Sequence, residues 1–404
     1  MTAVMRRIQT GNALAWFGPG LTAPLLYVYV AQVRALGSLT AGLTVTAFAA
    51  AALVVLPLVG TTIARRGPRP VLLAGLVAAA LGSACLGVAT TVTTTLIAGA
   101  LAGAGQAVVQ PSIATMIADC STPQTRSRAF ALQFFFLNLG VGLGGLAAGH
   151  LVDLARPATF TRVFAICAAA YLASAAVMAT VRTPAAVRLT PGGGRVSWRE
   201  LLHNRTMVLL CVLGFVVFFA FYGQFDAGLA AFGLQVAHIS PSTLGTALAA
   251  NTAMIAIAQF AVLRLAEQHR RTTVIAAVGL LWVVAWSIAG YAGLVPGSGT
   301  ATVAFVAAYV LFGLGEAMLS PTLAPLVPDI APEGMAGPYN AAFSLVKQVA
   351  LAIGPVAGGP IATLLPAPYI VAFALVSLGI TALALRTARH LSTAQNHPAF
   401  SGTP

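Results

Sequence analysis

The sequence has 404 residues, of which 59% are hydrophobic and only 7% are charged. A chain this poor in charge could not cover a globular fold with a water-compatible surface, so the composition excludes an ordinary water-soluble domain. The formal net charge of +13 would also fit a nucleic-acid-binding protein, and the placement of the arginines along the chain decides that question.

Apolar stretches long enough to cross a membrane recur along nearly the whole chain. About 20 helical residues cross a hydrocarbon core of roughly 30 Å. The stretches lack the alternation of a membrane β-barrel, so each is predicted to be a helix. The predicted spans are 10–32, 39–63, 71–90, 96–118, 128–150, 160–181, 207–231, 243–263, 273–293, 301–325, 339–362 and 366–386. The sequence therefore predicts an all-α membrane protein with twelve transmembrane helices.

The arginines are distributed unevenly about these spans. With both termini cytoplasmic, seventeen fall on the inner side and only Arg34, Arg156 and Arg162 fall on the outer side. This bias follows the positive-inside rule for a multi-pass protein of the cell membrane, and it leaves no basic stripe for nucleic acid. No cleavable signal peptide is predicted, because the first apolar run is too long and lacks a cleavage site.

No cofactor, metal or enzymatic motif is evident in the sequence. It contains no Walker-type GxxxxGK[ST] motif, so no ATP-hydrolysing site is expected. The spacing of the cysteines offers neither a disulfide framework nor a CxxC metal site. The four cysteines are Cys85, Cys120, Cys167 and Cys211.

The two halves of the chain repeat each other at a shift of 210 residues. The shift aligns Gly103, Gly105, Ala107, Pro111 and Asp119 with Gly313, Gly315, Ala317, Pro321 and Asp329. It predicts two pseudo-symmetric six-helix bundles, residues 1–181 and 207–404, the second with a short cytoplasmic tail. Residues 182–206 are predicted to be a cytoplasmic linker. Both halves start on the same side, as in transporters built from parallel repeats that rock around a central site.

Several motifs resemble those of the major facilitator superfamily, over essentially the full length. The segment 60–69 resembles the superfamily's cytoplasmic signature between helices two and three, although Ala64 stands where an Asp is usual. Tyr339 and Asn340 resemble the entry to helix eleven, with Ala336 and Pro338 in place of the expected arginines. The resemblance implies a cytoplasmic gate formed by Gly60, Arg65, Arg66, Gly67 and Arg69.

Glycines at four-residue spacing mark two further helices. The run 140–149 in helix five resembles the glycine-rich motif of antiporters without its proline, and helix eleven carries a closer copy at 354–359. Small residues on one helix face let neighbouring backbones approach closely, so packing is the expected role. The helix-packing glycines are predicted to be Gly140, Gly144, Gly149, Gly354 and Gly358.

Three ionisable residues lie at membrane depth, well inside the ends of their predicted spans, where a charge is costly and usually functional. Asp226 lies about 28 Å from the inner end of its helix, at 1.5 Å per residue. Glu316 and Lys347 lie at similar depths of about 14 and 12 Å. The three are predicted to couple transport to protons or substrate.

By resemblance to the superfamily, helices one, four, seven and ten line a central cavity, which contains Asp226 and Glu316. We expect Glu316 to take up and release a proton, because burial opposes its ionisation and Lys347 favours it. Two alternatives remain: a permanent Glu316–Lys347 ion pair that only holds helices together, and an Asp226 wetted by the outer vestibule. The polar residues expected to line the cavity are Gln106, Gln110, Asn138, Gln224, Asn251 and Tyr222.

The predicted function is proton-coupled secondary transport by alternating access. Resemblance to drug-efflux members through the glycine motifs implies export of small lipophilic or cationic molecules, and a cavity with few charges suits such substrates. A nutrient importer, for a sugar or another organic solute, and a non-transporting membrane sensor or scaffold are the alternatives. The expected partners are a small-molecule substrate, protons and the lipid bilayer, with the protein a monomer.

Overall fold

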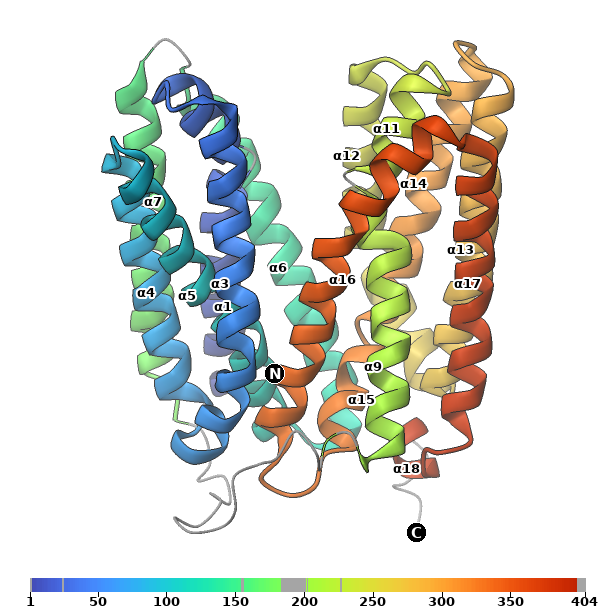
Figure 1. Cartoon of the computed structure of the whole chain (residues 1–404). Coiled ribbons are helices and arrows are strands. Elements are labelled where there is room, and N and C mark those ends of the chain that lie inside the picture. The colour runs from blue at the N-terminus through green and yellow to red at the C-terminus, as the bar shows by residue number, and fades with distance from the viewer. Residues whose placement is uncertain are drawn as a thin grey trace. The chain divides into compact units, whose positions relative to one another are not determined.

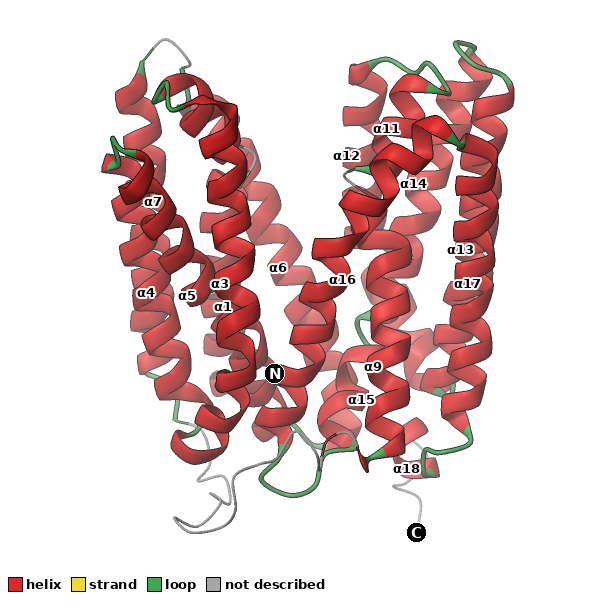
Figure 2. Ribbon diagram, viewed as in Figure 1, coloured by secondary structure: helices red, strands yellow, loops and turns green. Residues whose placement is uncertain are grey.

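The computed structural model describes residues 2–23, 25–153, 156–182, 201, 203–225 and 227–397. Within these ranges every regular element is a helix and no strand is present, as the sequence predicts (Figure 2). Most of the predicted linker at 182–206 lies outside the described residues.

The chain divides into two compact units. Unit 1 consists of Met1–Thr122, Leu132–Val196 and Ala331–Leu345, and unit 2 of Pro123–Ala131, Ser197–Ile330 and Val346–Pro404. The helices up to α7 (Figure 1) are α1 (Ala3–Thr22), α2 (Leu26–Val28), η1 (Tyr29–Val33), α3 (Gly37–Arg66), α4 (Pro68–Val88), α5 (Val92–Asp119), α6 (Pro123–Leu151) and α7 (Pro157–Ala179). The first nine residues of α6 belong to unit 2 and the remainder of the helix to unit 1.

The second half of the chain continues the pattern of long helices. Its elements are α9 (Arg205–Val217), η2 (Phe218–Tyr222), α10 (Gly223–Phe225), α11 (Gly228–Gln235), α12 (Pro241–Gln268), α13 (Arg271–Leu294), α14 (Gly299–Leu319), α15 (Leu323–Asp329), α16 (Ala336–Leu364), α17 (Pro366–Ala388) and α18 (Thr393–Asn396). The first ten residues of α16 belong to unit 1, and the rest belongs to unit 2.

Nine helical segments among the described residues are long and apolar enough to cross a membrane. They are Leu39–Arg66, Pro68–Val88, Val92–Asp119, Pro123–Ala148, Pro157–Ala179, Arg205–Gln235, Arg271–Leu294, Gly299–Asp329 and Pro366–Ala388. The two parts of α12, Ser242–Gln259 and Ala261–Gln268, meet at a bend of 54° and make a tenth if they form one span. The long helices α1 and α16 are not in this count.

Helix boundaries follow local signals in the sequence. Thr91 caps α5, and its hydroxyl accepts a hydrogen bond from the Thr94 backbone N–H, which is otherwise without a partner in the first turn. Ser298 caps α14 in the same way. Proline occupies the first position of α4 and α7, where its missing N–H costs nothing.

A π-helical turn lies near the start of each half of the chain. In unit 1 the predicted span 10–32 is divided into α1, α2 and the π turn η1. In unit 2 the π turn η2 separates α9 from α10. A π turn inserts an extra residue per turn and changes the direction in which the following side chains point, and such turns are frequent at functional sites.

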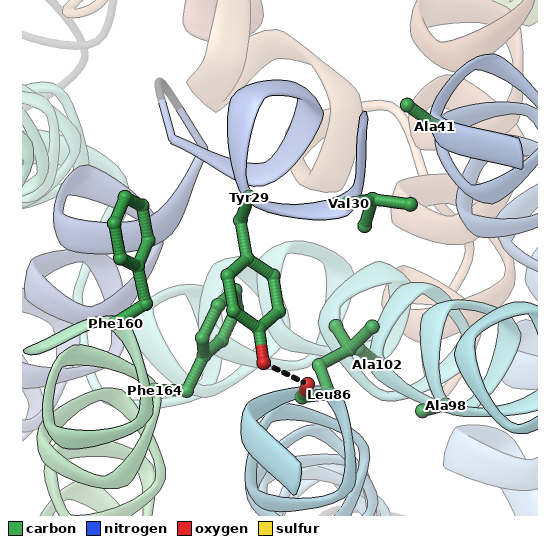
Figure 3. Close-up of a cluster of buried hydrophobic side chains, with 8 residues drawn as sticks. All are labelled: Tyr29, Val30, Ala41, Leu86, Ala98, Ala102, Phe160 and Phe164. Atoms are coloured by element: carbon green, nitrogen blue, oxygen red, sulfur yellow. Dashed lines mark hydrogen bonds between the residues drawn. The ribbon is translucent and has the colours of Figure 1, made fainter. Parts of the chain in front are cut away.

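An aromatic cluster fixes η1 within unit 1 (Figure 3). The Tyr29 ring stacks on Phe160 at a centroid distance of 5.4 Å and packs against Phe164 at 4.9 Å. Its hydroxyl lies 3.0 and 2.9 Å from the carbonyl oxygens of Leu86 and Gly87 on α4. Tyr29 therefore joins η1, α4 and α7 in one buried contact.

In unit 2, α13 packs against α14 and α17, and α12 packs against α14. The centre of the unit is a group of buried aromatic rings. Phe312 on α14 lies 4.8 Å from the ring of Phe221 on η2 and 5.3 Å from Trp286 on α13. Trp286 in turn stacks on Phe373 of α17 at 5.2 Å. These rings fix η2 against α14, one of the helices that carry the site described next.

Candidate functional site

Glu316 lies on α14 with 5% of its surface exposed. Its Oε1 accepts a hydrogen bond of 3.0 Å from Nδ2 of Asn251 on α12, and the same amide nitrogen lies 3.2 Å from the Tyr309 carbonyl. The Tyr222 hydroxyl forms a second hydrogen bond to the Glu316 carboxyl group. A carboxyl group buried at membrane depth is costly unless polar groups satisfy it. Asn251 and Tyr222 supply these groups.

Lys347 lies on α16, in the part of that helix that belongs to unit 2. Its Nζ is 4.8 Å from the centroid of the Phe218 ring, within the range of a cation–π interaction. Glu316 lies close enough for its charge to act on the Lys347 ammonium. The structure thus places the two intramembrane charges in one region of unit 2, and the Phe218 ring is a partner that the sequence did not indicate.

The π turn η2 brings this site together. It carries Phe218, which faces Lys347, and Tyr222, which bonds Glu316. The two rings also contact each other, with centroids 5.1 Å apart. Movement of this one turn would therefore alter the surroundings of both charges together.

The other polar residues predicted for this helix differ in their surroundings. Asp226 lies outside the described residues. Gln224 is fully buried, and its Nε2 donates a hydrogen bond of 3.0 Å to the Gly354 carbonyl. Its Oε1 accepts one of 3.3 Å from the Tyr369 hydroxyl. These bonds fasten α10 to α16 and α17.

The predicted polar residues of unit 1 are Gln106, Gln110 and Asn138. Gln106, the repeat mate of Glu316, accepts a hydrogen bond of 2.6 Å from the Tyr171 hydroxyl, while its Nε2 is buried without a partner among the described residues. Oε1 of Gln110 is likewise buried without such a partner. Asn138 donates to the Phe134 carbonyl of its own helix at 2.9 Å.

The predicted cytoplasmic motif lies where α3 ends and α4 begins. A Cβ on Gly60 would lie 2.8 Å from the Cα of Pro338, so this glycine lets the start of α16 approach α3. Gly67 ends α3 at φ 83°, a left-handed conformation that favours glycine. Arg65 and Arg66 are exposed, and Arg69 donates to the Ala179 carbonyl.

Four of the five predicted packing glycines make close helix contacts. A Cβ on Gly140 or Gly144 would collide with the backbone of α1, at Ala13 and Phe17. A Cβ on Gly354 would collide with the backbone of Gly223, and one on Gly358 with the Gln224 side chain. The surroundings of Gly149 lie outside what the structure describes.

A second charged group, which sequence reasoning missed, lies at the C-terminal end of α15. Asp329 forms ion pairs with Arg126 at the start of α6 and with Arg271 at the start of α13. Arg271 Nη2 also donates to the Ser127 hydroxyl at 3.0 Å. The signal in the sequence that could have indicated Asp329 is its place in the 210-residue repeat. The two arginines were recognised only as part of the excess of arginine on the predicted inner side. Among the described residues no group of three His, Cys, Asp or Glu side chains is placed to hold a metal.

The chain is similar to two drug-resistance proteins of Bacillus subtilis (strain 168). It is 29% identical to Multidrug resistance protein 2 over 161 residues, which is 39% of each chain. It is 27% identical to Multidrug resistance protein 1 over 164 residues, or 40% of this chain and 42% of the relative. The matched region thus spans about two fifths of the length of these relatives.

Solved structures with the same fold cover nearly the whole chain. The human organic anion transporter MFSD10 (TETRAN) matches with a TM-score of 0.80 at 17% identity, over 94% of this chain and 98% of that one. The E. coli fucose:proton symporter FucP matches with a TM-score of 0.77 at 16% identity, over 96% and 98%.

The family model for the Major Facilitator Superfamily matches residues 10–355 and 229–401, which together include most of the chain. The apolar helices and the structural matches agree with it. The chain therefore belongs to the Major Facilitator Superfamily and is a multi-pass membrane protein.

Proposed function

We propose that the protein is a proton-coupled secondary transporter that exports small lipophilic or cationic molecules by alternating access. The observation that carries the proposal is the buried Glu316 carboxyl group with Asn251, Tyr222 and Lys347 around it. A proton carrier needs a group that is stable in both protonation states. Asn251 can donate to the ionised form, and Lys347 lies near enough to balance its charge.

The surroundings of Glu316 favour a lipophilic substrate. Phe218 and Tyr222, the ring partners of Lys347 and Glu316, lie on the same π turn, and aromatic walls with few polar groups bind apolar ligands. The names of the two Bacillus relatives, which concern multidrug resistance, point the same way. Export is the direction that such a name implies, and the glycine-rich run in α6 supports it by resemblance to antiporters.

The proposed topology has twelve spans in two six-helix bundles, 1–181 and 207–404, with a cytoplasmic linker at 182–206. The number twelve is reached from the nine apolar segments by adding α1, α16 and the bent helix α12, with α12 counted as one span. The inward bias of the arginines supports a cell-membrane location with both ends cytoplasmic. We propose that the monomer is the transporting unit.

The coupling role of Glu316 is tested in proteoliposomes with an imposed pH gradient and a lipophilic cationic dye. Glu316→Gln keeps the size of the side chain and removes its ionisation. We expect gradient-driven dye accumulation to be abolished while reconstituted protein remains at the wild-type level. Glu267→Gln makes the same change at an exposed position on α12 and should transport normally. Unchanged gradient-driven transport by Glu316→Gln would rule out the proton role.

A double variant separates a proton switch from a structural ion pair. If Glu316 and Lys347 only hold α14 and α16 together, neutralising both should restore transport that either single change abolishes. If Glu316 carries the proton, Glu316→Gln/Lys347→Gln should remain uncoupled even where its thermal stability recovers. Dye counterflow without a gradient shows whether such a protein still moves substrate.

Transport assays in membrane vesicles and whole cells separate the alternative functions. In inverted membrane vesicles energised by respiration, an exporter accumulates the dye. An importer fails to do so and instead takes up a nutrient in whole cells. A sensor or scaffold shows neither activity, although it reaches the membrane.

A further inference from the structure

A groove on unit 1 is distinct from the site around Glu316. It encloses about 320 Å³ and lies between the C-terminal half of α3, the first half of α4 and the middle of α5. Its lining is apolar, with Val55, Leu58, Val71, Ala78 and Val108 among its walls. The volume would hold about ten waters at roughly 30 Å³ each, yet the walls offer them few polar partners. The groove is therefore suited to an apolar occupant.

The floor of the groove is formed by close packing of α4 on α5. A Cβ on Gly75 would lie 2.7 Å from Cβ of Val108, so the two helices approach closely there. The hydroxyl of Thr62, the uncharged polar side chain in the lining, donates to the Leu58 carbonyl of its own helix at 2.7 Å. This internal bond leaves Arg66 as the side chain of the lining that can donate to an occupant.

Each of the three helices continues from the groove into an exposed apolar face. On α3 this face carries Val54 and Leu58, with 69% and 62% of their surfaces exposed. On α4 it carries Leu81, and on α5 Ile97, with 55% and 64% exposed. Exposed aliphatic faces of membrane helices contact hydrocarbon. Leu58 is also a lining residue, so the groove borders the exposed face of α3 and a lipid chain can enter it from there.

One end of the groove is positively charged. Arg66, in the last turn of α3, is both a lining residue and exposed, and Arg65 precedes it. No acidic residue is among the lining residues. An arginine at a helix end, above an apolar groove, is arranged to pair with a phosphate at the membrane interface, because its guanidinium binds phosphate oxygens in a bidentate manner.

We propose that this groove binds an anionic phospholipid, with one acyl chain between α3, α4 and α5 and the phosphate on Arg66. The occupant is a bilayer lipid and not the transported molecule, because the groove borders the exposed face of α3 and its charged end lies at the end of α3. The bound lipid would brace α3 against α4 next to Gly67, the residue that ends α3.

Native mass spectrometry of the detergent-purified full chain tests this site with dioleoyl phosphatidylglycerol and dioleoyl phosphatidylcholine. We expect wild-type protein to retain one phosphatidylglycerol in preference to phosphatidylcholine by about fivefold, the effect of one basic residue on an anionic headgroup. Arg66→Gln should remove the preference. Arg264→Gln, which removes an exposed charge from α12, should keep it.

A steric variant tests the position of the acyl chain. Ala78→Phe should fill the groove and abolish retention of the single lipid, whereas Val77→Phe, an exposed neighbour outside the lining, should not. If Ala78→Phe melts at a lower temperature than wild type, Ala74→Leu, at an exposed lining position, makes a milder test.

Three results would overturn the proposal. They are equal retention of the two lipids by wild-type protein, wild-type retention by the filled-groove variants, and displacement of phosphatidylglycerol by the transported dye. The last result would assign the groove to the transport route.

Discussion

Arg271 and Asp329 form a buried ion pair, with Nη1 and Oδ2 2.5 Å apart and only 1% and 6% of the side chains exposed. Arg126 pairs with the other oxygen of the same carboxylate. One acid thus pairs with two arginines at the ends of three helices, α15, α13 and α6. The first residues of α6 are held in unit 2 by this cluster, together with a hydrogen bond of 3.0 Å from the Ser320 hydroxyl to the Phe130 carbonyl.

Loss of Asp329 should therefore destabilise the protein strongly. Asp329→Asn leaves the buried Arg271 without a counter-charge, a change that costs about 3–5 kcal/mol when one partner of a buried pair is removed. We expect a large fall in melting temperature in detergent. Asp153→Asn is the control, because the Asp153–Arg156 pair at 3.5 Å is largely exposed and worth at most about 1 kcal/mol. Equal melting temperatures for the two variants would contradict this account.

The short helix α18 should be held by its contacts with the start of α13. Oδ1 of Asn396 accepts hydrogen bonds from the backbone N–H of Thr272 at 3.0 Å and from its hydroxyl at 3.1 Å. Asn396→Ala leaves a buried backbone donor unsatisfied, at a cost of about 1–3 kcal/mol. Hydrogen exchange at residues 393–397 should become faster. Thr393→Ala, at an exposed position of the same helix, should leave exchange unchanged.

Two glycines of α6 should respond oppositely to alanine. At Gly144 an added Cβ would lie 2.9 Å from the Leu21 backbone nitrogen on α1, whereas at Gly142 nothing lies within 4 Å. Gly144→Ala should destabilise by about 1–3 kcal/mol because the helices must separate. Gly142→Ala should be neutral or stabilising by up to about 1 kcal/mol through helix propensity. Thermal unfolding measures both, and a stable Gly144→Ala protein would refute the close α1–α6 contact.

The Cys120 thiol, just after α5, should react slowly at neutral pH. Burial, helped by the neighbouring Asp119 carboxylate, raises the pKa of the Cys120 thiol from 9.0 to about 11. Because the thiolate is the reactive form, labelling by a maleimide should be about 10²-fold slower than for an unshifted thiol at pH 7.5. The rate should still rise as the pH approaches 11.

The measurement uses a chain in which Cys85, Cys167 and Cys211 are replaced by alanine. Asp119→Asn should lower the pKa of Cys120 and speed labelling, though by less than exposing the thiol in denaturant, because burial is the larger cause. A labelling rate equal to that of a free thiol at pH 7.5 would disprove the shift.

Sequence reasoning went furthest where the membrane restricts the choices. The helical character of the chain, its family and the unusual position of Glu316 and Lys347 inside apolar segments could all be predicted from the sequence. Lipid leaves few alternatives for backbone groups and charges. The ends of the helices were predicted less accurately than their existence. The span predicted at 10–32 is divided between α1 and α2, with η1 following α2, and the span at 301–325 is divided into α14 and α15, with Pro321 between them. Proline indicates where a helix can break but not whether it does.

What the sequence determined by itself is the kind of protein. Long apolar segments must become helices in lipid, and the bias of their flanking arginines predicts a topology. The partners of each charged residue were decided only by the tertiary structure. Asn251 and Glu316 are 65 residues apart in sequence, and Arg126 and Asp329 are 203 apart. Whether such residues meet depends on how each helix is rotated about its axis and how closely its neighbours pack. Local irregularities such as the π turn η2 change that rotation. Local sequence does not encode this rotation, because the energy that sets it comes from contacts between distant helices.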